Sequence, residues 1–282
     1  MNRIIYNETD SAYRAAEGLS KSAIDRLLRC PAEYKAGAPF DTSSLAFGRA
    51  LHMAVLQPEN FRQAYRAAQF SGATKAGKAE RQEAAAAGQT VLSAGDWSKI
   101  AAMRQNIQAH PLAGRLLRAG WPEASIYWDE PDPVSGVPRQ CKGRADWLAD
   151  DPDTGAVWLV DVKTTSGALS AQGLARHVAE YRYHRQAAWY TRGVERNARR
   201  VQGFVFIFTS TQAPHLCACC KLDGDALTIG LQECMEGLRI LGECERSGRW
   251  PGYGGGGAIT VGLPAWYTGK APAAAAPSAP PA

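Results

Sequence analysis

The sequence has no long hydrophobic run and no hydrophobic leader. None of its apolar stretches approaches the roughly 20 residues that a membrane-spanning helix needs. The opening residues Met1–Glu8 (MNRIIYNE) lack the apolar segment of a secretory signal peptide. We therefore expect a protein that remains in the cytoplasm and has no membrane partner.

Cysteine is too sparse to suggest a disulfide framework. The chain has seven cysteines, an odd number, and a reducing cytoplasm would keep them as free thiols. Cys217, Cys219 and Cys220 form a cluster, and Cys30 lies far upstream. Because Cys219 and Cys220 are adjacent on a strand-like segment, they are poorly placed as joint ligands, and we expect no iron–sulfur cluster.

The net charge is small but unevenly placed. The chain carries a formal charge of +5, and residues 176–200 alone contain seven Arg and two Glu, which is the same surplus. A local basic stretch fits contacts with nucleic-acid phosphates. The arginine count alone would favour a solvated helix face, and it is the position of the segment beside an acidic motif that favours DNA.

Composition and periodicity indicate a mixed globular fold. Apolar residues make up 45% and charged residues 21% of the chain, as in ordinary soluble proteins. The pattern predicts an early helix that starts at Ser20 or Ser22 and is stopped by Pro31, further helices at 43–56, 93–109, 112–119, 174–193 and 226–246, and strands at 124–130, 139–149, 156–165, 201–210 and 214–222. Residues 71–90 are either a mobile surface loop or a weak helix. This order of elements indicates an α/β or α+β fold with a mixed central β-sheet flanked by helices.

Two aspartates and a lysine surround a strong turn signal at residues 150–155 (DDPDTG). Since alternate residues of a strand share a face, Asp161 and Lys163 point the same way. Folding the chain back through the turn brings Asp146 opposite Asp161, within about one residue of register. Carboxylates whose Cβ atoms are about 5–8 Å apart can bind one Mg²⁺ between them.

Lys163 would give such a metal site its reaction. Beside a metal and a phosphate, an amine can orient or deprotonate water, or stabilise a pentacovalent phosphorane. The metal would activate water and neutralise phosphate charge. The alternative is an Asp–Lys ion pair on a sheet face, which the second aspartate across the turn makes less favourable. A nuclease is therefore the first hypothesis.

Five motifs, taken in order, resemble the PD-(D/E)xK nuclease superfamily. Asp146 with Asp161-x-Lys163 is similar to its catalytic core. Gln186 and Tyr190 resemble the Gln-x-x-x-Tyr motif of its RecB-like branch, and residues 48–52 (GRALH) resemble that branch's upstream Gly-x-x-x-His. Residues 19–22 (LSKS) with 30–34 (CPAEY) resemble its N-terminal helix signature, and residues 143–146 (GRAD), 161–165 (DVKTT), 183–186 (YHRQ) and 250–253 (WPGY) are most similar to the phage and prophage exonuclease VIII (RecE-type) nuclease domain.

This resemblance covers residues 18–253 and implies a restriction-endonuclease-like core at 123–253. A helical N-terminal part at 1–122 would be integral to the nuclease domain. Residues 254–282 would be a flexible tail, rich first in Gly and then in Ala and Pro. Its last residues, 271–282, contain only Ala, Pro and Ser, and we expect them to be disordered.

The resemblance also implies a role for each matching position. His52, Asp146 and Asp161 would bind the metal together with the backbone carbonyl of Val162, although a lone histidine on an apolar helix is more often a core residue. The catalytic set would be Lys163, Asp161, Asp146, Gln186 and Tyr190. From proximity alone we predict phosphate contacts by Arg49, Arg144, Thr164, Thr165, Arg182 and Arg185, and Glu123 is a candidate for a further carboxylate.

In that family the reaction is digestion of linear double-stranded DNA with Mg²⁺, for which Mn²⁺ can substitute. The resemblance implies a phage or prophage enzyme of bacterial cytoplasm that acts 5′ to 3′ as a ring-shaped trimer or tetramer. It would leave 3′ overhangs for a separate single-strand annealing protein. Three alternatives stay open: an endonuclease or structure-specific nuclease, a non-catalytic DNA-binding module, and a structural or interaction protein with fortuitous motifs.

Overall fold

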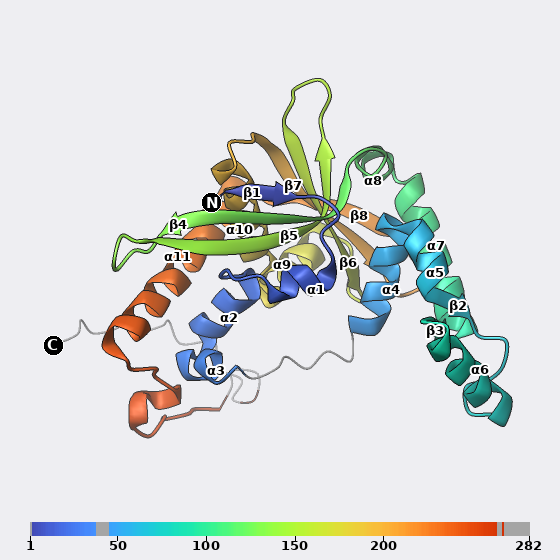
Figure 1. The fold of residues 1–282 in the computed structure, drawn as a ribbon, viewed down its shortest axis with the longest axis horizontal. Coiled ribbons are helices and arrows are strands. Elements are labelled where there is room, and N and C mark those ends of the chain that lie inside the picture. Colours follow the sequence, from blue (N-terminus) through green and yellow to red (C-terminus); the bar gives the residue numbers. More distant parts are fainter. Residues whose placement is uncertain (1, 38–44, 264–266, 268–282) are drawn as a thin grey trace.

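The central sheet contains six strands in the described part of the chain (Figure 1). This computed structural model describes residues 2–37, 45–263 and 267. The strand order is β1-β4-β5-β6-β7-β8, with bounds Arg3–Ile5, Trp121–Pro131, Pro138–Asp150, Val157–Thr165, Val201–Ser210 and Cys217–Lys221. Neighbouring strands are antiparallel except β6 and β7, which are parallel. The mixed sheet predicted from the sequence is confirmed.

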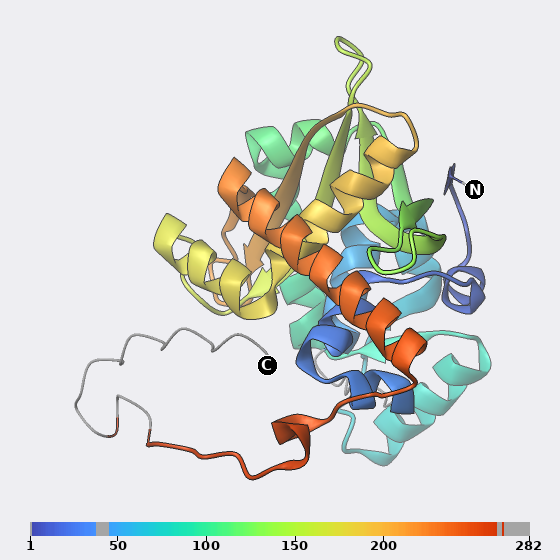
Figure 2. The ribbon, with the colours of Figure 1, turned by 90° about the vertical axis from the view of Figure 1, so that its left-hand side faces the viewer.

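One face of the sheet is covered by α2 (Lys21–Arg29), α10 (Tyr183–Arg196) and α11 (Gly224–Ser247), and the last two cross it in Figure 2. The core on this face includes Trp128 and Trp189, both fully buried, whose rings meet edge to face at 4.9 Å. The apolar alternation of β4 and the apolar stripe of α10 supply these two rings, so local pattern and burial agree.

The opposite face is covered by α4 (Leu45–Leu56), α7 (Ala94–Ala109) and α8 (Pro111–Leu116), which lie on the right of Figure 1. Val160 and Val162 of β6 point into this second core, whereas Leu159 points into the first. A strand buried on both faces needs the nearly continuous apolar run that the sequence shows here. Asp161 and Lys163 interrupt that run and share the face of Leu159.

The parallel pair β6–β7 requires a crossover connection, which consists of α9 (Ala171–Tyr181) followed by α10. The sequence predicted one helix at 174–193, and that prediction is wrong. Arg182 takes a left-handed conformation (φ 56°, ψ 38°) between the two helices. A non-glycine residue with positive φ ends a right-handed helix, so α10 starts in a new direction.

Several local predictions also need correction. Pro31 does not merely stop α2: it is the first residue of α3 (Pro31–Ala36), where its missing N–H costs nothing. For residues 71–90 the sequence left a loop or a weak helix open, and the helix alternative is the one that forms, as α6 (Lys75–Ala86), which Thr74 caps through its hydroxyl. The strand predicted at 214–222 is shorter in the structure, where it is β8 and begins at Cys217. The sequence analysis did not predict β1, α1, α5, β2 or β3, whose bounds are Arg3–Ile5, Asp10–Ala15, Pro58–Ala64, Tyr65–Ala67 and Thr90–Leu92.

Beyond α11 the chain forms a short 3-10 helix, η1 (Tyr253–Gly256). Residues 271–282, which the sequence predicts to be disordered, lie outside the described residues, as does Ser43 at the predicted start of the second helix. Across 2–37, 45–263 and 267, we find no helix with the length and apolarity that crossing a membrane demands.

The feature that positions the site is a split between β5 and β6. Their ladder extends from Asp150 opposite Val157 only as far as Trp147 opposite Val160. Beyond that point β5 continues beside β4, and β6 continues beside β7 to Thr165. The two strands thus separate in the middle of the sheet, where backbone groups become free to bind side chains.

The close approach of α10 to β4 predicts that Gly193 cannot accept a side chain. A Cβ there would lie 2.6 Å from the Trp128 ring and 3.0 Å from Ile126. Gly193→Ala should lower the free energy of unfolding by about 1–3 kcal/mol through overpacking. Urea denaturation would measure this loss.

Gly95→Ala is the matched control, because among the described residues a Cβ at Gly95 in α7 meets only the Ser93 Oγ atom, at 3.9 Å. That variant should be at least as stable as the wild type, since alanine favours helix. If Gly193→Ala were equally stable, the packing described for α10 would be incorrect.

Candidate active site

Asp146 and Asp161 lie at the point where β5 and β6 separate. The last paired residues are Trp147 and Val160, so the two aspartates occupy the next position along the ladder. There the Asp146 Oδ2 atom accepts the N–H of Val162 at 2.9 Å, in place of a strand-to-strand bond. The two carboxylates that the sequence placed across the turn are therefore brought together.

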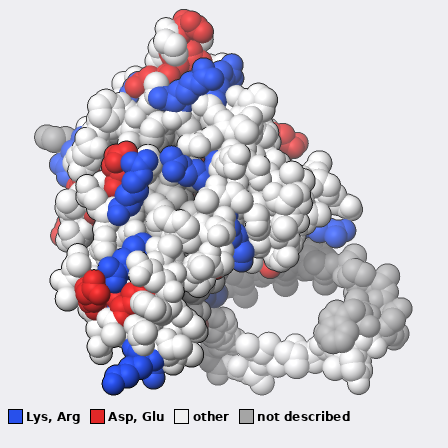
Figure 3. Space-filling model, turned by 90° about the vertical axis from the view of Figure 1, so that its right-hand side faces the viewer, with Lys and Arg blue, Asp and Glu red and all other residues white. Residues whose placement is uncertain are grey.

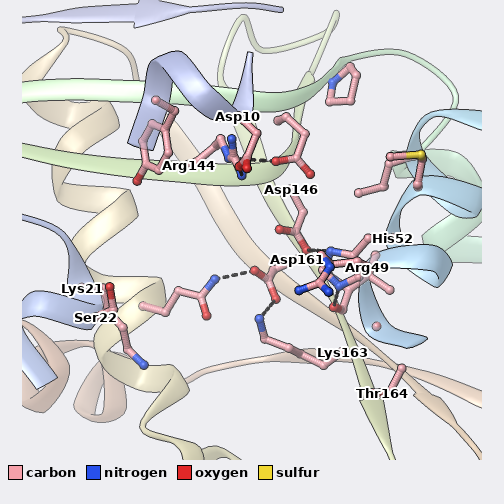
Figure 4. Close-up of a pocket in the computed structure, with 18 of the residues that line it drawn as sticks. Asp10, Lys21, Ser22, Arg49, His52, Arg144, Asp146, Asp161, Lys163 and Thr164 are labelled. Atoms are coloured by element: carbon pink, nitrogen blue, oxygen red, sulfur yellow. Dashed lines mark hydrogen bonds and ion pairs between the residues drawn. The ribbon is translucent and has the colours of Figure 1, made fainter. Parts of the chain in front are cut away.

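His52 reaches the same point from α4, far upstream in the sequence. Its Nε2 atom lies 2.5 Å from the Val162 carbonyl oxygen, and its Nδ1 atom lies 3.2 Å from Asp146 Oδ2 (Figure 4). The imidazole is 27% exposed and lines a cleft. It is therefore part of the site and not a residue of the apolar core.

Glu123 completes a group of three donor residues. The ligand atoms of His52, Glu123 and Asp146 all lie within 4.8 Å of one another. Glu123 stands at the start of β4 with a positive φ of 51°, an uncommon conformation for a non-glycine residue that often marks a functional position. One imidazole and two carboxylates suit a divalent cation such as Mn²⁺ or Mg²⁺.

The carboxyl groups of this site are hard to keep charged without a cation. Burial, and then the charge of Asp146, raise the pKa of Glu123 to about 7. The same two causes raise the pKa of Asp161, whose side chain is 1% exposed. A bound cation would reverse both effects, because it favours the ionised carboxylate. The residues present thus fit a metal.

Asp161 is held by two neighbours on its own face of the sheet. Lys163 Nζ lies 2.5 Å from Asp161 Oδ1, and the Gln186 amide of α10 donates to Oδ2 (Figure 4). Burial lowers the pKa of Lys163, but attraction by Asp161 and Asp146 outweighs burial and holds it above its ordinary value. Lys163 is therefore a charged amine, and it forms the Asp–Lys ion pair that the sequence left open as the alternative.

Tyr190 lies one helical turn beyond Gln186 and packs on β5. A Cβ at Gly143 would lie 2.6 Å from its ring. The glycine of the GRAD motif therefore allows α10 to approach β5 closely enough for Gln186 to reach Asp161. Tyr190 lines the same cleft as Gln186.

The site opens into a cleft of about 1610 Å³. Four of the predicted phosphate contacts line it: Arg49, Arg144, Thr164 and Thr165. The Thr165 hydroxyl oxygen already accepts a hydrogen bond within the protein, from the N–H of Gly167 at 2.9 Å. Lys21, Arg26 and Lys142, which the sequence analysis did not single out, also line the cleft.

The N-terminal segment forms one wall of the cleft. The Arg144 guanidinium bonds Asp10 of α1 at 2.6 Å and Glu123 at 2.9 Å, and it lies 4.7 Å from the Tyr13 ring centre. Residues Asp10 and Tyr13 were missed because a six-residue helix has too few turns to show a pattern. They hold Arg144 beside the carboxylates.

The basic segment at 176–200 is mostly structural. Arg185 bonds Glu233 and Asp25, at 2.6 and 2.9 Å, and is not among the cleft residues. Arg192 and Arg196 both bond Glu130, at 2.8 and 2.6 Å. These placements favour the helix-face interpretation of that segment, and they pair the Arg185 guanidinium with carboxylates of neighbouring helices.

Arg182 donates to the carbonyl of Ala179 and is not among the residues that line the cleft, although its two neighbours in sequence, Tyr181 and Tyr183, are. On the face shown in Figure 3, lysine and arginine side chains form small groups, several of them beside acidic ones, with no continuous basic stripe. Inside the cleft, Arg49 and Arg144 lie near the carboxylates (Figure 4).

The cysteines are all free thiols within the described structure. Cys217 and Cys219 pack toward the α4–α7 face of the sheet, and Cys220 packs toward the α10–α11 face. Adjacent strand residues point to opposite faces, so Cys219 and Cys220 cannot approach one cluster together.

Comparison with known proteins places this geometry in a family. A family model described as "PDDEXK-like domain of unknown function (DUF3799)" matches residues 20–260. None of the curated proteins matches the chain. A solved structure described as a "Putative exonuclease" from Eubacterium rectale aligns with 93% of this chain and 98% of its own, at 12% identity and a TM-score of 0.60. The crystal structure of SSO0001 aligns with 79% of this chain and 78% of its own, at 13% identity. Its TM-score of 0.34 is too low to indicate a shared fold.

The raised pKa of Glu123 predicts that metal binding depends on pH. In the metal-free protein this carboxyl is protonated below about pH 7, and a cation must displace that proton. The increase in Tm on adding Mn²⁺ should therefore be larger at about pH 8 than at about pH 6, with proton release on binding. Calorimetry in buffers of different ionisation enthalpy would measure the protons released.

The control for this experiment is Glu123→Gln, which has no titrating group at that position. In this variant the increase in Tm should be smaller and should vary less with pH. Equal stabilisation of the wild type at both pH values would show that Glu123 takes no part in binding the metal.

Proposed function

The chain belongs to this family of PDDEXK-like domains, and on that premise we propose that it is a metal-dependent nuclease. The observation that carries the proposal is the meeting of His52, Asp146 and Asp161 where β5 and β6 separate, with the Lys163 amine beside them. These groups face a cleft that arginine side chains enter. This is the arrangement that hydrolysis of a phosphodiester requires.

The metal would be held by His52, Asp146, Asp161 and the Val162 carbonyl, with Glu123 as a further carboxylate. When bound, such a cation supplies a Lewis acid and an activated water. Mg²⁺ is the proposed ion, and Mn²⁺ would substitute for it.

The chain's own residues would bind and polarise the scissile phosphate. Arg144 neutralises phosphate charge, and its contacts with Asp10 and Tyr13 hold the guanidinium in place. Lys163, being charged, donates to the phosphorane oxygen and stabilises its developing charge. Gln186 keeps the Asp161 carboxylate oriented, and Tyr190 fixes α10 against β5.

We propose further that the substrate is linear double-stranded DNA, degraded from its 5′ end to leave 3′ overhangs. The motifs that resemble the RecE-type nuclease domain support this choice. On the same ground we propose a ring-shaped homo-oligomer, a separate single-strand annealing partner and a phage or prophage origin. An endonuclease acting on the same core is the alternative, and circular DNA distinguishes the two.

The purified protein should release acid-soluble nucleotides from linear duplex DNA with Mg²⁺ or Mn²⁺. Lys163→Ala should lower kcat about 100-fold or more, because the transition-state charge loses its donor. Lys78→Ala, which removes an exposed lysine of α6, should leave the rate unchanged. Strands labelled at the 5′ or the 3′ end would report polarity.

Two outcomes of this assay would contradict the proposal at different levels. Absence of released nucleotide with either metal would refute the nuclease function. Cleavage of covalently closed circular DNA would refute the exonuclease mode and leave the nuclease function in place.

Gly48 offers an independent test of where DNA lies. In the helix α4 a Cβ at this position meets no atom of the described residues within 4 Å, yet the residue lines the cleft. Gly48→Ala should raise stability by about 0.5–1 kcal/mol, as for glycine in a helix interior. It should also weaken duplex binding if a DNA backbone passes close to α4. Unchanged affinity, measured by fluorescence anisotropy, would place the DNA elsewhere.

A further inference from the structure

A group of three aromatic rings lines the cleft next to Lys163. The rings belong to His177, Tyr181 and Tyr183, at the junction of α9 and α10. Lys163 Nζ lies 4.8 Å from the centre of the Tyr183 ring. The Tyr181 and Tyr183 rings are stacked, with centres 5.6 Å apart and an interplanar angle of 19°.

Two of the three rings, those of His177 and Tyr183, support the third, that of Tyr181, which is the exposed one. Tyr183 stacks at 5.5 Å on Phe206, which is fully buried in the sheet core. His177 packs against Tyr181 at 4.5 Å and meets Phe208 edge to face at 5.4 Å. Tyr181 itself is 50% exposed. An apolar ring is thus kept at the surface by a rigid base.

The backbone is adapted to this arrangement. Arg182, between the two tyrosines, is the residue in the left-handed conformation, with φ 56°. In one continuous helix, residues two positions apart, such as Tyr181 and Tyr183, would point to different sides of the helix. A left-handed conformation is unfavourable for a non-glycine residue, and its effect here is to bring Tyr181 alongside Tyr183. Such local strain often marks a functional position.

We propose that Tyr181 is a stacking site for an unpaired nucleobase, the base of a nucleotide adjoining the phosphate that Lys163 contacts. This inference rests on the proposed nuclease function and extends it. A nucleotide offers a phosphate to the amine and a flat aromatic face to the ring, and the cleft presents those two features one ring apart. Aromatic stacking on exposed bases is the usual way in which proteins bind single strands.

The proposal has a mechanistic consequence. A base within a duplex has both faces covered by its neighbours, so it can stack on Tyr181 only after it leaves the helix. The protein would therefore separate the terminal base pair of a DNA end and hold the freed base while the adjoining phosphate lies at the carboxylates. Closed duplex DNA, which has no end to open, would lose this contact.

A double-mutant cycle between the ring and the base tests the proposal. Affinity is measured by fluorescence anisotropy with Ca²⁺ in place of Mg²⁺, on linear duplexes with an abasic site placed at successive positions from the end. At one position the abasic site should weaken wild-type binding about tenfold. Tyr181→Ala should lose the same factor on intact DNA and lose nothing more on that abasic DNA.

Further variants separate the aromatic face from other contributions. Tyr181→Phe should bind as the wild type does, because it keeps the ring. Tyr181→Leu keeps apolar volume without an aromatic face, and it should show the same loss of affinity that is expected for Tyr181→Ala. It therefore provides the test if the alanine variant is unstable. Phe70→Ala, which removes a ring that is 51% exposed outside the cleft, is the control and should not affect binding.

The outcomes distinguish this proposal from the proposed function. Independent losses from the variant and the abasic site, or no loss at any position, would overturn the stacking site. If Mg²⁺-dependent cleavage persisted in that case, the nuclease function would stand. A wild-type protein that neither bound nor cleaved DNA would overturn both.

Discussion

The hydrogen bond from the Val162 N–H to the Asp146 carboxylate is the interaction on which the site depends. It replaces the ladder bond that is lost where β5 leaves β6, so a buried backbone group stays paired while the sheet opens. The carbonyl of Val162 is then available to the His52 ring. Val162 of β6 is thereby hydrogen-bonded both to Asp146 of β5 and to His52 of α4. The site thus forms at the point where the two strands separate.

Burial gives that site its electrostatic character. Asp161 is almost fully enclosed, and burial, followed by the nearby charge of Asp146, raises the pKa of Glu123. An enclosed acidic group needs a cation. The Lys163 amine partly meets this need, and the proposed metal would meet the rest.

Arginine side chains serve different purposes in different parts of the molecule. Arginines of the basic segment, such as Arg192 and Arg196, neutralise the buried Glu130 and fix α10 to β4. Among the arginines that line the cleft, Arg144 belongs to the GRAD motif and is positioned by Asp10 of α1. A count of charges along the chain could not distinguish these uses, because a guanidinium pairs with whichever carboxylate the fold brings near.

The sequence alone determined five of the six strands of the sheet, the turn and the placing of Asp146 against Asp161, because strand period and turn chemistry are local and fix register. The Gln186 and Tyr190 spacing likewise follows from one helix. Only the tertiary structure decided that Glu123 joins His52 and that the chain reverses at Arg182, separating α9 from α10. Those features arise from contacts between distant segments, whose partners a local pattern does not specify.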